Sequence, residues 1–266
     1  MTEGALEDRD LRIGDHGPGG GVRIEPTARR VRAVVAGTTV ADSRSVLLLL
    51  ERGHLPVYYF PLADVRTDLL EPTSKSTNCP WKGDASYWTV RVGDQTRQNA
   101  VWGYQEPLPE AAAIKGHVAF YWNKVDAWFE EDDQVFVHPR SPYHRVDVLN
   151  SSRHVRVEIA GETVAETRRP RLLLETGLPT RYYVPRLDVR MDLLQPTGTT
   201  TQCPYKGKAV YWTATVGDTV AKDVVWSYPF PVPECPKIEQ LLAFFNERVD
   251  LYVDGQLQPR PKTPWS

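Results

Sequence analysis

Two short segments of the sequence place a thiol and an amine close together. Cys79 is followed three residues later by Lys82 and then a glycine, and Cys203 is followed by Lys206 in the same way. An ammonium group beside a thiol favours the thiolate, which is the reactive form in nucleophilic and redox chemistry. Cys79 and Cys203 are therefore candidate catalytic residues. The alternative is that each cysteine is a small apolar core residue in a turn shaped by proline and glycine.

A second pair of segments alternates acidic and basic residues. The motif Asp-Val-Arg-x-Asp contains Arg66 in one segment and Arg190 in the other. If the motif is extended, its three charges share one face. Arg66 and Arg190 could then bind a carboxylate or phosphate through two hydrogen bonds, with Lys82 and Lys206 as further charges. The alternative is a network of internal ion pairs that braces the loop.

Aromatic residues follow these charges along the chain. Trp102 and Tyr104 share one face of an expected strand, because strand side chains alternate between faces. Aromatic walls with one or two charges are typical of small-ligand sites. We therefore expect one pocket in each half of the chain. The aromatic candidates are Tyr87, Trp102, Tyr104, Tyr211, Trp226 and Tyr228. The alternative is that these rings only fill the core.

The candidates occur in pairs because the chain contains one domain twice. Val31–Phe129 aligns with Val155–Val253 without a gap, and about half of the aligned residues are identical. A repeat of this length is a whole domain rather than a unit of a solenoid. We expect a disordered tail over residues 1–21, a first domain over 22–138, a linker over 139–145 and a second domain over 146–266. We also expect the two domains to contact each other.

Short apolar runs between turn signals predict strands in both copies. Val31–Val35 ends at Ala-Gly and predicts the first strand of a hairpin. Ala85–Val92 runs into the turn Gly93-Asp94 and predicts a strand that pairs with Val101–Tyr104. Val118–Trp122 and Val125–Phe129 indicate another hairpin.

Each copy also has one stretch that favours a short helix. It follows the prolines near Pro109 in the first copy, and it covers Pro236–Phe245 in the second. Together these elements predict a mainly β fold with two tandem homologous domains. Each domain is expected to consist of small, curved antiparallel sheets and one short helix.

The segments around the two cysteines resemble a known bacterial family. The motif Thr-x-Cys-Pro-aromatic-Lys-Gly spans residues 77–83 and 201–207, each time after Asp-Val-Arg-x-Asp and before an aromatic strand. This pattern is similar to domain of unknown function 427. The resemblance implies a β-tent architecture, in which two small antiparallel sheets lean together near right angles, and it implies no settled activity. Other β-tent domains often hold zinc with paired Cys-x-x-Cys motifs, which this sequence lacks, so we expect no metal and no other cofactor.

Composition and missing motifs narrow the function further. A net charge of -2 gives no electrostatic case for nucleic acid, and no apolar run is long enough to cross a membrane, so we expect neither partner. Three scattered cysteines and the lack of a signal-peptide pattern favour the cytoplasm. The sequence has no phosphate-binding glycine loop, no metal-ligand cluster and no serine-nucleophile elbow. Neither His54 nor His117 recurs in the second copy, so no shared general base accompanies the thiols.

We expect the residues that both copies share to carry the chemistry. The leading hypothesis is a duplicated module that binds a small molecule or a modified residue in one aromatic pocket per domain. Two alternatives stay open: a cytosolic enzyme that uses the cysteine thiols, and a scaffold that binds nothing small.

Overall fold

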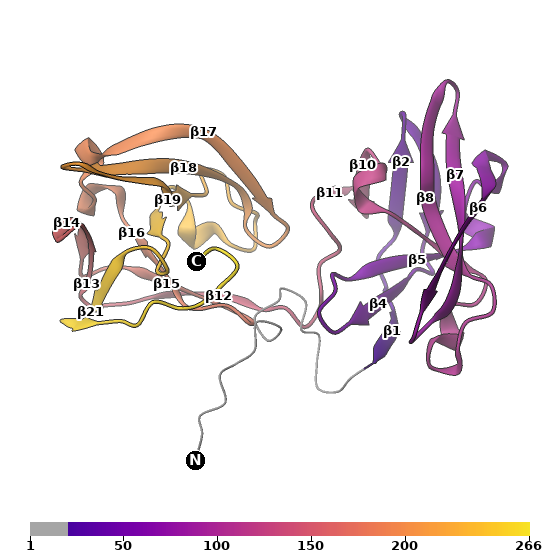
Figure 1. Ribbon diagram of the computed structural model, residues 1–266, viewed down its shortest axis with the longest axis horizontal. Helices are drawn as coiled ribbons and strands as arrows, with labels where there is room; N and C mark the ends of the chain where they lie inside the picture. The colour runs from indigo at the N-terminus through magenta and orange to yellow at the C-terminus, as the bar shows by residue number, and fades with distance from the viewer. Residues whose placement is uncertain (1–20) are drawn as a thin grey trace, which may run out of the picture. The chain divides into compact units, whose positions relative to one another are not determined.

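The computed structural model describes residues 21–266, which form two compact domains. The boundary lies between Tyr143 and His144, so domain 1 covers residues 21–143 and domain 2 covers residues 144–266. Except for Gly21, the tail expected over residues 1–21 lies outside the described residues. Strands dominate both domains, and the two halves have the same sheets, which confirms the mainly β prediction (Figure 1).

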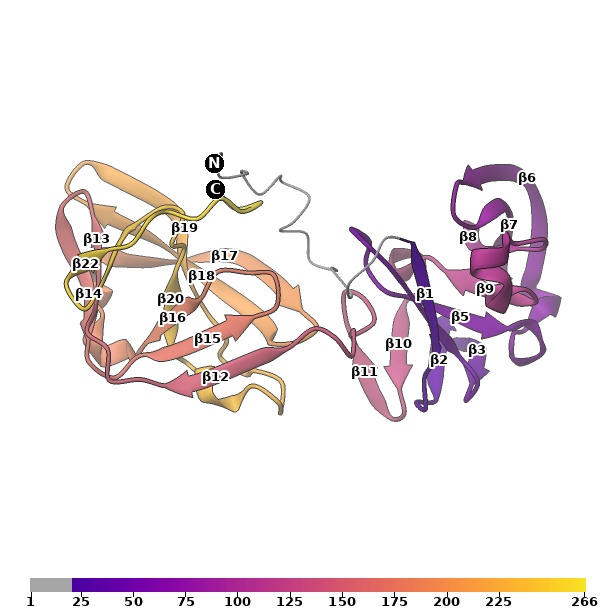
Figure 2. The same cartoon turned by 90° about the horizontal axis from the view of Figure 1, so that it is seen from below.

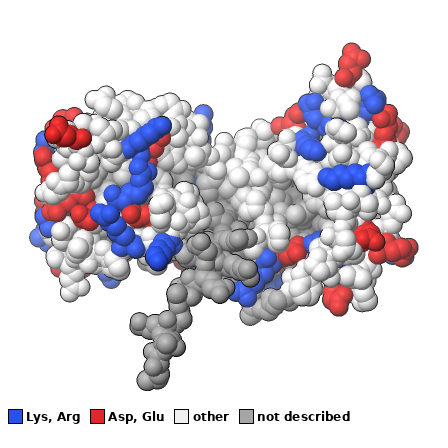
Figure 3. All heavy atoms as spheres, in the orientation of Figure 1, with Lys and Arg blue, Asp and Glu red and all other residues white. Residues whose placement is uncertain are grey.

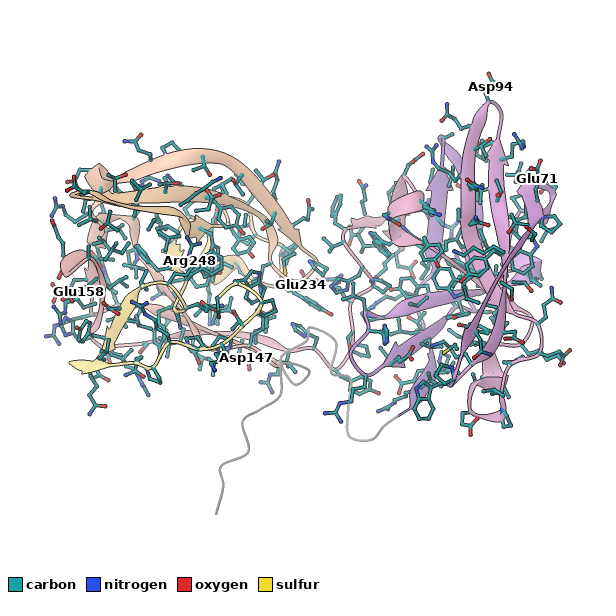
Figure 4. All side chains as sticks on the ribbon, viewed as in Figure 1. Glu71, Asp94, Asp147, Glu158, Glu234 and Arg248 are labelled. Carbon is teal, nitrogen blue, oxygen red and sulfur yellow. The ribbon has the colours of Figure 1, made fainter. Side chains whose placement is uncertain are left out.

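Domain 1 contains a seven-stranded and a four-stranded antiparallel sheet. The seven-stranded sheet has the order β1 (Val22–Pro26), β4 (Leu47–Glu51), β5 (Val57–Pro61), β9 (His117–Phe120), β8 (Gln95–Tyr104), β7 (Gly83–Val92) and β6 (Leu70–Cys79). The four-stranded sheet has the order β11 (Asp133–Val135), β10 (Ala127–Glu130), β2 (Val31–Val35) and β3 (Thr38–Ser43). Two predicted pairings are confirmed: β2 pairs with β3, and β7 pairs with β8 in a hairpin whose tip carries Asp94 (Figure 4).

Domain 2 repeats this arrangement (Figure 2). Its seven-stranded sheet has the order β12 (Val146–Asn150), β15 (Arg171–Glu175), β16 (Arg181–Val184), β20 (Leu242–Phe244), β19 (Thr219–Ser227), β18 (Gly207–Val216) and β17 (Leu194–Cys203). Its four-stranded sheet has the order β14 (Glu162–Thr167), β13 (Val155–Ile159), β21 (Asp250–Val253) and β22 (Gln256–Leu257).

The main core of each domain lies between its two sheets. In domain 1, burial alternates along β2, so that Val31 and Val35 face this core. Side chains along β5 alternate between the two faces of the sheet. Tyr58 and Phe60 point into the main core, while Tyr59 belongs to a cluster on the opposite face. The central strands β4 and β5 are therefore buried on both faces, which explains why their sequences are continuously apolar.

A second, smaller core covers the other face of the seven-stranded sheet. In domain 1 it contains Tyr59, Tyr87 and Tyr104, and the 3-10 helix η3 (Pro109–Ile114) packs on it through Ile114. We call this cluster the outer core. Domain 2 has an equivalent outer core, built around Leu173, Tyr183, Trp226 and Tyr228. Most of the candidate site residues lie in these two clusters.

The short helix expected near Pro109 is present as η3, but one predicted helix and one predicted hairpin are wrong. All helices in residues 21–266 are short 3-10 helices, and each domain has several of them rather than one. The helix expected over Pro236–Phe245 is wrong: η7 (Pro236–Ile238) is followed by β20, because pairing with β16 and β19 overrides the local helix propensity. The second predicted hairpin is also wrong. Strands β9 and β10 join different sheets, with η4 (Trp122–Lys124) between them.

Charged side chains on the surface often pair with an opposite charge on a neighbouring strand. Arg91 of β7 pairs with Glu71 of β6, and Arg30 pairs with Asp42 of β3. Figure 3 shows both signs of charge on the visible face of each domain, with one band of Lys and Arg on domain 2. None of the helices in the described part of the chain is long and apolar enough to cross a membrane.

Candidate functional site

An ion pair anchors the outer core of each domain. In domain 1 the ammonium of Lys82 pairs with the carboxylate of Glu51, and only 9% and 15% of these side chains are exposed. In domain 2, Lys206 pairs with Glu175 in the same way. The glutamate ends β4 or β15, and the lysine lies in the turn after β6 or β17. Each lysine charge is therefore neutralised within its own domain.

The Cys-Pro-x-Lys-Gly segment forms the turn that places this lysine. In domain 1 the backbone N–H of Lys82 donates to the carbonyl of Cys79 (3.2 Å), and the carbonyl of Lys82 accepts from Leu108 (3.1 Å). Gly83 has a φ of 93°, and a Cβ there would lie 3.4 Å from the carbonyl oxygen of Glu106. The positive φ favours glycine, so the motif has a structural reason to recur.

In domain 2 a histidine reinforces the ion pair. Nε2 of His144 lies 3.0 Å from Glu175, and its ring stacks on Tyr205 at 4.2 Å. Burial favours a higher pKa for Glu175, but the hydrogen bonds and charges of His144 and Lys206 outweigh it and lower that pKa. Burial likewise opposes the charge on Lys206, but Glu175 raises the pKa of this lysine overall. Both members of the pair are therefore charged at neutral pH.

Aromatic hydroxyl and indole groups satisfy one another inside the outer core. In domain 1 the indole N–H of Trp102 donates to the hydroxyl of Tyr59 (3.2 Å), and the rings meet edge to face. In domain 2, Trp226 donates to Tyr183 (3.0 Å). Burial raises the pKa of Tyr59 and of Tyr104, so both hydroxyls stay protonated at neutral pH. The structure thus brings together, within each domain, the candidates Lys82, Tyr87, Trp102 and Tyr104, and Lys206, Tyr211, Trp226 and Tyr228.

The candidate thiols lie at the edge of this cluster. Cys79 and Cys203 are free and partly buried, and they pack against the outer cores. The lysine of each Cys-Pro-x-Lys-Gly segment is paired with a glutamate of its own domain. Domain 2 contains a third thiol, Cys235, whose pKa is raised to about 11, chiefly by burial.

The two motif arginines lie apart from the outer cores. Their motif is not extended in domain 1, because it forms the 3-10 helices η1 (Leu62–Asp64) and η2 (Thr67–Leu69). Between them, Arg66 donates two hydrogen bonds to the carboxylate of Asp68 (2.8 and 2.6 Å), and Arg190 makes the same pair in domain 2. Within residues 21–266 no hydrogen bond, ion pair or ring contact joins either arginine to Lys82, Lys206 or the candidate aromatic residues. The bracing alternative describes this geometry better than a ligand clamp.

The rim of the outer core in domain 1 carries an unpaired ammonium over aromatic rings. Nζ of Lys75 lies 4.1 Å from the ring centre of Tyr87 and 5.9 Å from that of Tyr121. The ring of Tyr121 lies 4.5 Å from that of Trp102, and the hydroxyl of Tyr87 lies 2.8 Å from Oγ1 of Thr77. No carboxylate within the described residues pairs with Lys75. We call these five residues the aromatic face of domain 1.

Tyr121 shows that this face is only partly open to solvent. Burial and the neighbouring hydroxyl of Tyr87 raise the pKa of Tyr121 to about 12, so its hydroxyl is a hydrogen-bond donor at neutral pH. Trp102 is partly exposed, and the side chains of Lys75 and Thr77 reach solvent. The face therefore combines ring surface and hydroxyl groups with the ammonium of Lys75, and a second ammonium, that of Lys124, lies 5.1 Å from the ring centre of Tyr121.

The corresponding face of domain 2 is covered. Thr199 and Phe245 stand where domain 1 has Lys75 and Tyr121, so the ammonium and one hydroxyl are lost. Trp226 packs on Phe245 at 4.6 Å and is only 7% exposed. The two outer cores are alike inside, but their rims differ.

The repeat coincides with a known family. The sequence model of the family described as Domain of unknown function (DUF427) matches residues 23–131 and, separately, residues 147–255. The chain is a tandem member of the DUF427 family. Each match falls within one domain, so the protein contains two DUF427 domains. Comparison with curated proteins finds no match.

Sequence reasoning missed part of the rim in the first DUF427 domain. Lys75 and Tyr121 were not among the candidates, because the second DUF427 domain does not share them. The signal in the sequence was the difference between the copies: the first has Lys75 and Tyr121 where the second has Thr199 and Phe245, within an otherwise similar aromatic set. A comparison that looks for shared residues discards this signal.

The second DUF427 domain also has an open pocket of about 460 Å³. It is lined by His154, Glu166, Thr167, Arg168, Arg169 and Asp188. Nε2 of His154 lies 2.7 Å from Glu166, and Asp188 accepts hydrogen bonds from Thr167 (2.7 Å) and Arg169 (3.1 Å). Both carboxylates of the pocket are thus already paired. Over residues 21–266, no group of three or more His, Cys, Asp or Glu side chains is arranged to hold a metal ion.

Proposed function

We propose that the protein is a non-enzymatic binding module whose ligand site is the aromatic face of domain 1. The observation that carries this proposal is the position of Lys75. Its ammonium lies over the rings of Tyr87 and Tyr121, and no carboxylate in the described chain neutralises it. A cation without a carboxylate partner beside partly exposed aromatic rings can recognise an anionic aromatic ligand.

The ligand class follows from the groups on the face. The rings of Trp102 and Tyr121 offer surface for a flat ring, which stacks on them without needing a deep cavity. Lys75 supplies one positive charge at the edge, and the hydroxyl groups of Thr77 and Tyr121 can hydrogen-bond polar substituents. We therefore propose a planar aromatic compound that carries a carboxylate or phosphate.

The proposal implies one ligand per chain. Domain 2 retains Tyr211 and Trp226 but has neither the lysine nor the second tyrosine hydroxyl, and its tryptophan is buried. Its outer core supports the fold of the domain without offering the same site.

A thermal-shift screen tests the proposal. The wild-type protein is heated with aromatic carboxylates such as benzoate and indole-3-acetate and with nucleoside monophosphates, because a bound ligand stabilises the folded state in proportion to the logarithm of its concentration over Kd. We expect at least one probe to raise the Tm, and Lys75→Gln to abolish the rise. The matched control Lys208→Gln removes an exposed lysine of domain 2 and should keep it. If no probe raises the Tm, or if Lys75→Gln responds like the wild type, the proposed site is wrong.

A further inference from the structure

Segment 258–266 crosses domain 2 as a proline-rich strap. Its sequence is Gln-Pro-Arg-Pro-Lys-Thr-Pro-Trp-Ser, with prolines at three of nine positions. After β22, one backbone hydrogen bond, from Gln258 to the carbonyl of Leu251 (2.8 Å), links this strap to the rest of the domain as described. Prolines have no N–H to donate, so the strap is attached mainly by side chains. In Figure 1 it is the yellow segment that leads back to the end of the chain within domain 2.

The strap is folded on itself where it meets the domain. The backbone N–H of Thr263 donates to Oγ of Ser266 (2.9 Å), and the N–H of Ser266 donates back to the carbonyl of Thr263 (3.1 Å). Oγ of Ser266 also donates to the carbonyl of Pro261 (3.3 Å). Prolines and internal hydrogen bonds reduce the entropy that the segment loses on docking. The strap therefore has the properties of a preorganised peptide ligand.

The receptor for the strap is a buried ion pair. Arg181 donates two hydrogen bonds to the carboxylate of Glu247 (2.7 and 2.6 Å), whose side chain has no exposed surface. The hydroxyl of Thr263 donates to Oε1 of the same carboxylate (2.6 Å). Burial would raise the pKa of Glu247, but these hydrogen bonds lower it, so the carboxylate is charged and accepts the Thr263 hydrogen bond at neutral pH.

Aromatic rings complete the receptor around Arg181. The guanidinium carbon lies 5.5 Å from the ring centre of Trp226 and 5.8 Å from that of Phe245. The indole of Trp265 in the strap lies 5.8 Å from the same carbon. Arg248 also lies beside Phe245 (5.9 Å) and is labelled in Figure 4. The arginine is thus held by two rings of the domain and by one ring of the strap, which suits a cation with a delocalised planar charge.

Domain 1 has neither the receptor nor the occupant. Val57 and Asn123 stand at the positions of Arg181 and Glu247. The segment after β11 turns at Val137, where φ is 73°, and leads to Tyr143, whose hydroxyl donates to Glu25 (2.6 Å). The ion pair, the threonine and the tryptophan therefore occur together in one domain and are absent together from the other.

We infer that this face of domain 2 is a recognition groove for a proline-rich segment that contains Thr-Pro-Trp, and that segment 258–266 is its ligand within the chain. A partner protein with an exposed segment of this kind would compete for the Arg181–Glu247 pair and the rings beside it. Trp265 is 39% exposed, and the strap adds no strand to either sheet beyond β22. A partner segment can therefore displace the strap without breaking the hydrogen bonds between the strands of the domain. This inference does not depend on the function proposed for domain 1.

A peptide-exchange experiment tests the groove. A specific protease site is inserted between Gln258 and Pro259 of the full chain, and the chain is cut in the native state. A fluorescein-labelled peptide with the sequence of residues 259–266 is then added, and fluorescence polarisation reports its binding. We expect saturable binding to the cut chain and little binding to the uncut chain, in which the strap fills the groove. Peptides that carry Thr263→Val or Trp265→Ala should bind at least about tenfold more weakly, because each loses a contact to a buried charge.

A second variant tests the groove without cutting the chain. In the intact chain, Trp265→Ala weakens the strap and should increase binding of the labelled wild-type peptide above that of the wild-type chain. The matched control, Trp81→Ala, removes an exposed tryptophan of domain 1 and should leave peptide binding unchanged. The inference is overturned if neither the cut chain nor the Trp265→Ala chain binds the peptide. It is also overturned if the substituted peptides bind as tightly as the wild-type peptide, which would indicate non-specific adsorption.

Discussion

Domain 1 and domain 2 share an interior and differ at its rim. Both have a buried lysine–glutamate pair beside a tyrosine that accepts from a tryptophan. At the rim, domain 1 presents Lys75 and Tyr121, whereas domain 2 places its strap over Arg181 and Glu247. The shared residues satisfy one another, whereas Lys75 at the rim of domain 1 has no carboxylate partner within the described residues. In this protein, identity between the copies marks what builds the domain, and the binding that we propose for each domain depends on residues that differ between the copies.

The largest expected effect comes from breaking the shared ion pair. Lys82→Met leaves the carboxylate of Glu51 buried without a partner, and an unpaired buried charge destabilises a protein by about 3–5 kcal/mol. Lys206→Met should cost less in domain 2, because His144 still hydrogen-bonds Glu175. Urea unfolding measures the free energy, and the double variant Lys82→Met/Glu51→Leu should recover most of the loss. A loss below about 1 kcal/mol in either domain would show that the pair does not support the interior in the way that we describe.

A smaller effect is expected from acid, which should lower the stability of domain 2. The pKa of Glu175 and the pKa of Glu247 are both lowered in folded domain 2. A carboxyl with a lowered folded pKa stabilises the domain above its unfolded pKa of about 4.3, and this stabilisation is lost as the pH falls through the folded pKa. We therefore expect the stability of domain 2 to fall below about pH 4.

Urea unfolding followed from pH 3 to pH 7 measures this dependence. Glu247→Gln should flatten it, because the variant has one carboxyl fewer to protonate. The residue at this position in domain 1 is Asn123, so Asn123→Gln is a matched control without an effect on the pH dependence. An unchanged pH dependence in Glu247→Gln would contradict the role given to the buried receptor pair.

The smallest effect is expected for the motif arginines. Arg66 and Arg190 are exposed, and each pairs with the aspartate two residues further along the chain. Exposed ion pairs contribute little to stability, so Arg66→Ala/Arg190→Ala should leave the unfolding midpoint nearly unchanged. The double variant should also keep the thermal shift caused by the ligand of domain 1. Loss of that shift would restore the arginine clamp as the better description of the site.

Local patterns were sufficient to predict much of the fold. The turn at Gly93-Asp94 and the hairpin after Val35 follow from dipeptides that demand a particular turn, and both pairings are present. Pro236–Phe245 could not be assigned from its local sequence, because β20 forms only through partners far away in the chain. The same holds for the lysine–glutamate pair: the sequence identified Lys82 and Lys206 but not the glutamates, which lie 31 residues away.

The rim of the site was harder to predict than the interior. Lys75 and Tyr121 lie on separate strands or strand ends, and only the folded sheet brings them to one surface. The aromatic candidates of each domain lie together in its outer core, but nothing in their spacing distinguishes a ring that fills the core, such as Tyr104, from one that reaches the surface, such as Trp102. That distinction depends on what covers each face. In domain 2, Phe245 packs on Trp226, where domain 1 has the hydroxyl-bearing Tyr121.

A titration followed by nuclear magnetic resonance tests the difference between the domains most directly. The protein is labelled with ¹⁵N at its tryptophan indoles, and the signals of Trp102 and Trp226 are assigned by substituting each in turn with phenylalanine. An aromatic carboxylate that raises the Tm is then added in steps. We predict that the indole signal of Trp102 shifts and saturates with one ligand per chain, while that of Trp226 stays in place. Equal shifts at both tryptophans, or a shift at Trp226 alone, would contradict the claim that the divergent rim rather than the shared interior decides where the protein binds.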